Sequence, residues 1–165
     1  KDGIFPAGNA AANLLGFTTQ NAAKVEVATN KLSLPRLIVG KETVIHTRRP
    51  ESWKALSSKE AALLDFLRQG GKSSELSPEE TVKKLLEHFR DKDQFERLIR
   101  VAESEPPRVR AMLGAIGQQI GSPKDILISL KKSLNSLSRF DFGNLITLKY
   151  AKQWQAKDSK IHETI

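Results

Sequence analysis

The chain has 165 residues, of which 39% are hydrophobic and 28% charged, and this composition is typical of a folded soluble domain rather than a disordered segment. Cysteine is absent, which excludes disulfides, thiolate metal sites and cysteine nucleophiles and suits a reducing compartment. No apolar run approaches the roughly 20 residues that a membrane span requires, and the first residues lack the apolar core of a signal peptide. We therefore expect a cytoplasmic protein with no membrane association.

The net charge of +8 is unevenly distributed along the chain. Lys and Arg outnumber Asp and Glu by 8 to 4 in residues 1–56 and again by 8 to 4 in residues 111–165, whereas residues 57–110 hold 11 of each sign. Basic ends favour acidic partners such as nucleic acid or an acidic protein face. An ordinary solvated surface would have the same composition, so charge alone leaves both interpretations open.

The first predicted element is a short helix over Ala10–Leu15, a run rich in helix formers. Asn9 is the best candidate for its N-cap, and Gly16 is placed to end the helix in the left-handed conformation. A helix this short is not stable alone, so it must pack against other elements.

Three strands are predicted to follow this helix and to form a small antiparallel sheet. Lys24–Thr29 alternates with a period of two, which indicates a half-buried strand. Arg36–Val39 and Thr43–Thr47 are rich in β-branched residues and flank Gly40-Lys41, a pattern typical of a β-hairpin.

From Ser57 onward the apolar residues recur at helical spacing. Ser57 and Glu60 match a capping box, and Ser77-Pro78 marks a second helix start. Either Asp91 or Asp93 would cap a third helix. The predicted breaks between the helices are Gly70-Gly71, Pro106-Pro107 and Gly121-Ser122-Pro123.

The last part of the chain is less regular. A further helix is predicted to carry the apolar residues Leu127, Leu130, Leu134 and Leu137. Leu145–Tyr150 is either a strand or a short helix. Together the elements predict an α+β fold in one unit, residues 1–165, with a small sheet and one short helix in residues 1–56 and a multi-helix part in residues 57–165.

The sequence contains no recognisable catalytic or metal site. His46, His88 and His162 lie far apart, and none has another histidine three or four residues away. Gly121-Ser122 is followed by Asp125 alone, without the Asp-x-Asp pair that holds magnesium in polymerase-like transferases. We therefore expect a binding module rather than an enzyme, with no metal and no cofactor.

The most informative segment is Pro6–Gln20, which reads Pro-Ala-Gly-Asn-Ala-Ala-Ala-Asn-Leu-Leu-Gly-Phe-Thr-Thr-Gln. It resembles the block that opens the C-terminal domain of AbiEi-type antitoxins, in which a turn such as P-S-G leads into an A-A-N-x-L-G-L-[ST]-T-Q helix and turn. That family continues with a strand, matched here by Lys24–Thr29, and a hairpin that ends in a basic strand, matched by Ile38–Arg49. Further on, Leu134–Gly143 resembles an L-N-P-L-S-R-[FY]-D-F-G stretch of longer members, with Ser136 in place of the proline.

The resemblance implies a protein of two parts. AbiEi-type antitoxins carry an N-terminal winged helix that binds operator DNA and represses the operon. The domain that this chain resembles follows it and is linked to neutralising a cognate nucleotidyltransferase toxin. The pair is described as type IV, in which the antitoxin opposes the toxin's effect without needing a stable complex, although some members act on the toxin or promote its modification. Because the chain starts at Lys1 and its only Met is Met112, we expect the winged helix to lie upstream.

Two groups of basic residues are the candidate partner-binding residues. They are Arg36, Lys41, Arg48 and Arg49 on the predicted hairpin, and Lys131, Lys132 and Arg139 near the C-terminus. Arg48 and Arg49 precede Pro50, which predicts an exposed position at the end of a strand. These side chains are expected to contact phosphates of DNA beside the winged helix or of toxin-bound RNA. A stand-alone nucleic-acid-binding domain is the alternative function, and an enzyme with an unrecognised site is a third.

Overall fold

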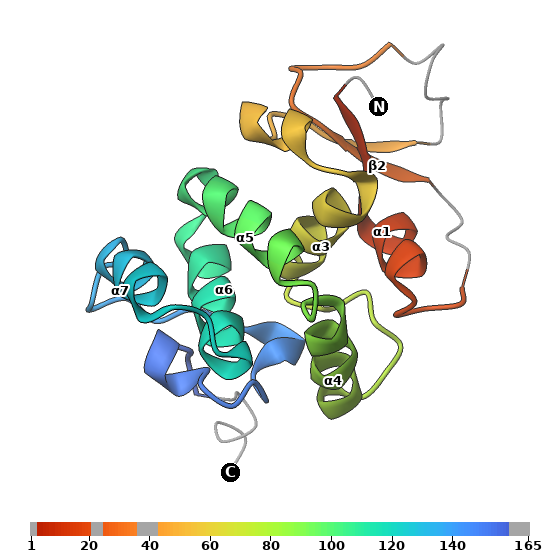
Figure 1. Ribbon diagram of the computed structural model, residues 1–165. Helices are drawn as coiled ribbons and strands as arrows, with labels where there is room; N and C mark the ends of the chain where they lie inside the picture. Colours follow the sequence, from red (N-terminus) through yellow and green to blue (C-terminus); the bar gives the residue numbers. More distant parts are fainter. Residues whose placement is uncertain (1–2, 21–24, 36–42, 159–165) are drawn as a thin grey trace.

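The computed structural model describes residues 3–20, 25–35 and 43–158. Figure 1 shows a small sheet and helix α1 (Gly8–Leu15) at the N-terminal end of the molecule, with further helices extending away from it toward the C-terminus. Helix α3 (Ser58–Arg68) lies between these two parts. The predicted α+β fold, a small sheet followed by helices, is confirmed.

The sheet has three strands in the order β1 (Ile4–Pro6), β2 (Glu26–Thr29) and β3 (Val44–His46). Strand β1 pairs antiparallel with β2, but β2 and β3 run parallel, so the predicted antiparallel sheet is wrong for this pair. A parallel pair requires a long connection that returns the chain to the same end, and the chain between β2 and β3 is long enough to provide one. The predicted strand Arg36–Val39 lies outside the described residues.

Strand β1 was not predicted, because three residues that end in proline carry almost no periodicity. Its backbone pairs with β2, with Ile4 opposite Thr29 and Pro6 opposite Val27. Pro6 has no amide hydrogen to donate, which is tolerated because β1 is an edge strand.

Helix α1 begins one residue before the predicted cap. Its N-cap is Ala7, not Asn9, and no side chain within the helix caps it. The first amide is bonded instead by a distant residue, since the Gly8 N–H donates to Asp65 Oδ2 at 2.8 Å. The predicted end is confirmed, because Gly16 has φ 84° and its amide donates to carbonyls of the last turn.

The helical part begins with a 3-10 turn, η1, and continues to the end of the described chain. Besides α3, its elements are η1 (Glu51–Ala55), α4 (Pro78–His88), α5 (Lys92–Val101), η2 (Ala102–Ser104), α6 (Pro107–Ile120), α7 (Lys124–Lys132), η3 (Gly143–Leu145) and η4 (Lys152–Trp154). The capping predictions are confirmed for Ser57, whose side chain and that of Glu60 form both bonds of a capping box, and for Ser77. Asp91 caps α5, which decides between the two candidate aspartates.

Helix α7 is shorter than predicted. It ends at Lys132, and the two last leucines of the predicted stripe lie beyond it. Leu134 is buried, but Leu137 is 88% exposed, so its assignment to the apolar face of a helix is wrong. The serines and Asn135 between Lys132 and Arg139 favour turns over helix, since their side chains compete for backbone hydrogen bonds.

One hydrophobic core connects the sheet, the helices and the C-terminal turns. Every residue from Ala61 to Leu67 of α3 is buried, so this helix has no solvated face along most of its length. Phe17, which follows α1, stacks on Phe66 of α3 with ring centroids 4.0 Å apart. At the other end Trp154 packs against α6 where Gly114 leaves room: a Cβ at that position would lie 2.2 Å from the indole ring. Within the described ranges, no helix is long and apolar enough to cross a membrane.

Candidate partner-binding surface

The two arginines at the end of the predicted hairpin lie just after β3 and differ in their surroundings. Arg48 is exposed, with φ 62°, and its amide donates to the Lys31 carbonyl at 3.1 Å. Arg49 donates its amide to the Thr29 carbonyl at 2.8 Å, which fixes its backbone beside β2. The other two members of this group, Arg36 and Lys41, lie outside the described residues.

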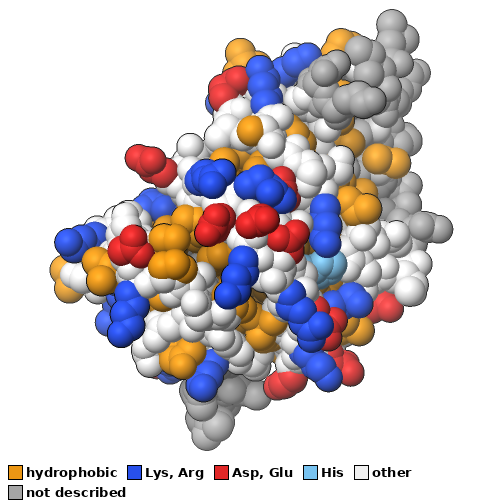
Figure 2. Space-filling view, viewed as in Figure 1, with side chains coloured by type: hydrophobic (Ala, Val, Ile, Leu, Met, Phe, Trp, Pro, Cys, Tyr) orange, Lys and Arg blue, Asp and Glu red, His pale blue; other side chains and the backbone are white. Residues whose placement is uncertain are grey.

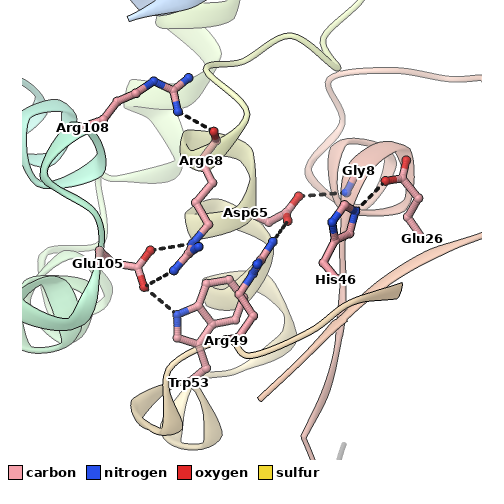
Figure 3. Close-up of polar contacts among 9 residues, drawn as sticks. All are labelled: Gly8, Glu26, His46, Arg49, Trp53, Asp65, Arg68, Glu105 and Arg108. Carbon is pink, nitrogen blue, oxygen red and sulfur yellow. Dashed lines mark hydrogen bonds and ion pairs between the residues drawn. The ribbon is translucent and has the colours of Figure 1, made fainter. Parts of the chain in front are cut away.

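The Arg49 side chain points into the protein, as Figure 3 shows, and only 14% of it is exposed. Its guanidinium lies 3.6 Å from Asp65 Oδ1 and 5.6 Å from the centroid of the Trp53 ring. Burial, together with the nearby charge of Arg68, lowers its pKa. The prediction that Arg49 is an exposed phosphate contact is therefore wrong, because a buried carboxylate and an indole face bind it inside.

Asp65 connects three parts of the chain. Its side chain is buried on α3, where Oδ2 accepts the Gly8 amide of α1 and Oδ1 faces Arg49 after β3. Burial raises the pKa of the Asp65 carboxyl, and the Gly8 amide and the Arg49 charge oppose that shift. The separation of 3.6 Å from Arg49 is too long for a hydrogen bond, so the contact with Oδ1 is ionic.

A second buried carboxylate, Glu105, is bonded more completely. It accepts the indole N–H of Trp53 at 2.8 Å and two guanidinium N–H groups of Arg68 at 2.9 and 3.2 Å (Figure 3). Arg68 also lies over the Trp53 ring, 5.4 Å from its centroid, and its carbonyl accepts a hydrogen bond from Arg108. This network holds η1, α3 and α6 together. Each of its charged groups already has partners inside the fold, so the network is not available to a ligand.

His46 and His88, the two histidines among the described residues, have separate partners inside the fold. His46 Nε2 lies 3.0 Å from Glu26 Oε1. His88, half-buried on α4, donates from Nε2 to the Leu15 carbonyl at 2.8 Å and lies against Phe17. Burial lowers the pKa of His88, and the hydrogen bond to the Leu15 carbonyl opposes that shift. His162 lies outside the described residues, and no group of three or more metal-ligating side chains occurs among those that the structure describes.

The second basic group lies at the end of α7 and in the loop that follows. Lys132 and Arg139 are exposed, whereas Lys131 is half-buried over Trp154, with its ammonium 4.8 Å from the ring centroid and in contact with the Gln153 carbonyl. Burial and then the charge of Arg139 lower the pKa of Lys131. Lys131 contacts Gln153, and Gln155 bonds the Ser138 carbonyl just before Arg139, so both parts of this group lie against the same C-terminal segment.

This group differs from Arg49 in having no carboxylate partner among the described residues. None of Lys131, Lys132 and Arg139 forms an ion pair with a carboxylate of the described residues. On the face that Figure 2 shows, acidic and basic side chains are interspersed over the central helices, so this face has no continuous basic track. The group at Lys131–Arg139 is the candidate partner-binding surface.

The sequence indicated neither buried network. The bonds from Asp65 to Gly8 and from Glu105 to Trp53 join residues 57 and 52 positions apart, and no local pattern marks such pairs. The only signal was Asp65, a carboxylate within an otherwise apolar helical segment. Searches of family models, curated proteins and solved structures found no match to this chain.

Proposed function

We propose that this chain is the antitoxin domain of an AbiEi-type regulator, which counteracts a cognate nucleotidyltransferase toxin and assists repression of its operon. The observation that carries the proposal is the block Pro6–Gln20, which resembles the opening of that domain over consecutive residues. The later stretch Leu134–Gly143 adds a second resemblance in the same order along the chain. The proposal is for a binding module without catalysis of its own.

The contacts of the first block give a physical reason for its residue types. Ala11 and Ala12 are fully buried against other elements, where larger side chains would not fit. Gly16 adopts a left-handed conformation, and Phe17 stacks on α3. Thr18 donates from its hydroxyl to Glu75 at 2.9 Å. These residues build the fold, so in this proposal the block marks the domain and the function is carried by other residues.

The distribution of charge supports a binding role for the C-terminal end. Asp65, Glu105 and Arg49 are bonded within the protein, whereas Lys131, Lys132 and Arg139 have no described carboxylate as a partner. Cations that no carboxylate neutralises raise the rate at which an acidic partner associates.

The test is co-expression of the full-length protein with the nucleotidyltransferase encoded beside its gene. We expect the toxin alone to stop growth and the full-length protein to restore it. The matched control is the same protein carrying Asp65→Ala, which removes a buried charge from the core and should lower the amount of folded protein. Failure of the wild-type protein to restore growth would overturn the proposal.

A stand-alone nucleic-acid-binding domain is the second candidate, and the observation that favours it is the same basic group. It predicts that this chain binds duplex DNA with an affinity that falls steeply as salt is raised, because each phosphate contact releases counterions. Weak binding of duplex DNA, with an affinity that does not change with salt, would exclude this second candidate.

A further inference from the structure

A cavity of about 500 Å³ is lined by residues of α5, η2, α6 and α7 and of the turn that follows α7. On the face that Figure 2 shows, hydrophobic side chains gather between α7 and α5. The apolar residues that line the cavity are aliphatic: Ile99, Ala102, Ile126 and Leu130. A cavity of this volume is large enough for a small organic molecule.

Four charged side chains line the same cavity without pairing with one another. Arg100 and Arg110 are the cations, and Glu103 and Asp125 are the carboxylates. Among the residues that the structure describes, none of the four forms an ion pair. Because the opposite charges around this cavity do not neutralise each other, both signs are available to a ligand.

Neutral acceptors hold the Arg110 guanidinium in place. Its Nε donates to the Glu105 carbonyl at 3.1 Å, and its Nη1 donates to the carbonyl and the hydroxyl of Ser133 at 2.9 and 2.8 Å. The Ser133 hydroxyl donates in turn to the Leu130 carbonyl at 2.6 Å. Within the described part of the chain Nη2 forms no hydrogen bond, so its N–H groups remain for a carboxylate. A guanidinium fixed in this way loses little conformational entropy when a ligand binds it.

We infer that this cavity binds a small zwitterion with an aliphatic body, a dipeptide or free amino acid with aliphatic side chains. Arg110 binds its carboxylate, Glu103 and Asp125 bind its ammonium group, and the aliphatic lining binds its side chains. The balance of two cations and two carboxylates favours a ligand that carries both charges over a simple anion or cation. The described lining contains no aromatic ring on which a nucleobase could stack. This inference does not depend on the proposed function.

The test is titration of this chain with the dipeptide leucyl-leucine, followed by the amide signals in nuclear magnetic resonance spectra. We expect saturable shifts at residues 99–103 and 125–133. N-acetyl-leucyl-leucine lacks the ammonium group and leucyl-leucine amide lacks the carboxylate. Each should bind about tenfold more weakly or worse, because each loses hydrogen bonds between charged groups. Leucine in the same titration distinguishes the free amino acid from the dipeptide, and saturable binding of either supports the inference.

A variant of the two carboxylates tests their role as the ammonium site. In Glu103→Gln with Asp125→Asn, leucyl-leucine and its N-acetyl form should bind with affinities within about twofold of each other. The matched control is Glu79→Gln with Glu87→Gln, which makes the same change in net charge at exposed carboxylates of α4 outside the cavity. The control should keep the preference for the free ammonium group.

A variant that fills the cavity tests its location without disturbing the bonds of Arg110. Ser129→Trp adds a large side chain at an exposed position of α7 that lines the cavity. It should abolish the saturable shifts while thermal unfolding matches that of the wild type. Shifts that persist in this variant would place the ligand elsewhere and overturn the inference. Absence of saturable shifts in the wild type up to about 10 mM dipeptide and leucine, or equal binding of the acetylated, amidated and free dipeptides, would also overturn it.

Discussion

Arg49 and Arg139 are the last residues of the two basic groups that the sequence offered as partner-binding candidates, yet their surroundings in the fold differ. Arg49 is bound inside by Asp65 and Trp53, and its backbone is fixed beside β2. Arg139 donates hydrogen bonds to the Ser136 and Ser138 carbonyls and remains exposed. The difference lies in what surrounds each residue: a buried carboxylate binds the first, and no described carboxylate pairs with the second. Basic residues in a sequence therefore indicate a partner surface only where the fold supplies no internal anion.

The largest expected effect comes from removing the internal anion. Asp65→Ala leaves the Gly8 amide and the Arg49 guanidinium without a buried partner, and breaking a buried pair costs about 3–5 kcal/mol. Urea unfolding measures the loss of unfolding free energy. Asp65→Asn should lose less, because its amide oxygen still accepts the Gly8 N–H. The control is exposed Glu96→Ala, and an Asp65→Ala protein as stable as that control would contradict a structural role for the network.

A smaller effect is expected where the C-terminal segment docks on α6. Gly114→Ala places a Cβ 2.2 Å from the Trp154 ring, and overpacking of this kind costs about 1–3 kcal/mol. Gly117→Ala in the same helix meets Leu127 and Phe95 at 3.0 and 3.1 Å, so it should destabilise less. Thermal unfolding compares the two variants. Equal stability of both would mean that Trp154 does not pack as the fold requires.

The pH dependence of stability should contain a contribution from His88. Burial lowers its folded pKa below the ordinary 6.5, so the unfolded chain binds a proton first as the pH falls. This contribution is fully present above pH 6.5 and is lost as the pH falls from 6.5 toward the lower folded pKa. The difference in unfolding free energy between the wild type and His88→Asn, followed from about pH 7.5 to about pH 5.5, should therefore narrow. A difference in unfolding free energy that stays constant over this pH range would contradict the assignment of this contribution to His88.

The smallest effect on stability is expected at the candidate partner-binding surface. Lys132→Glu reverses an exposed charge that has no described carboxylate as a partner, so the unfolding free energy should stay within about 0.5 kcal/mol of the wild type. Its association rate with the nucleotidyltransferase at low salt should fall several-fold, because charges at the rim of an interface steer encounter. Exposed Lys72→Glu is the control with the same change in net charge. If both variants slow association equally, the partner is attracted by the net charge of the protein and not by Lys132 in particular.

The sequence predicted those features of the fold whose cause is local. The caps at Ser57 and Ser77 and the end of α1 at Gly16 each depend on residues within about four positions. The parallel pairing of β2 and β3 could not be read locally, because it depends on the path of the intervening chain. The first amide of α1 is bonded by Asp65 rather than by Asn9, and that partner is 57 residues away.

The surroundings of the candidate basic residues could be predicted only in part. Lys132 and Arg139 are exposed, which is the usual state of a charged side chain. Arg49 is not, because its surroundings are built by Trp53 and Asp65, which the sequence does not mark as neighbours. Leu137 was assigned to a helical stripe by spacing alone, and the serine-rich segment before it ends α7 first.

Amide hydrogen exchange of this chain, alone and with the purified nucleotidyltransferase, compares the two regions in one measurement. Binding at the C-terminal loop should slow exchange over residues 133–139 and leave residues 46–53, which include Arg49 and Trp53, unchanged. Slower exchange over residues 46–53 without any change in the loop would contradict the distinction between a structural and a partner-binding basic group.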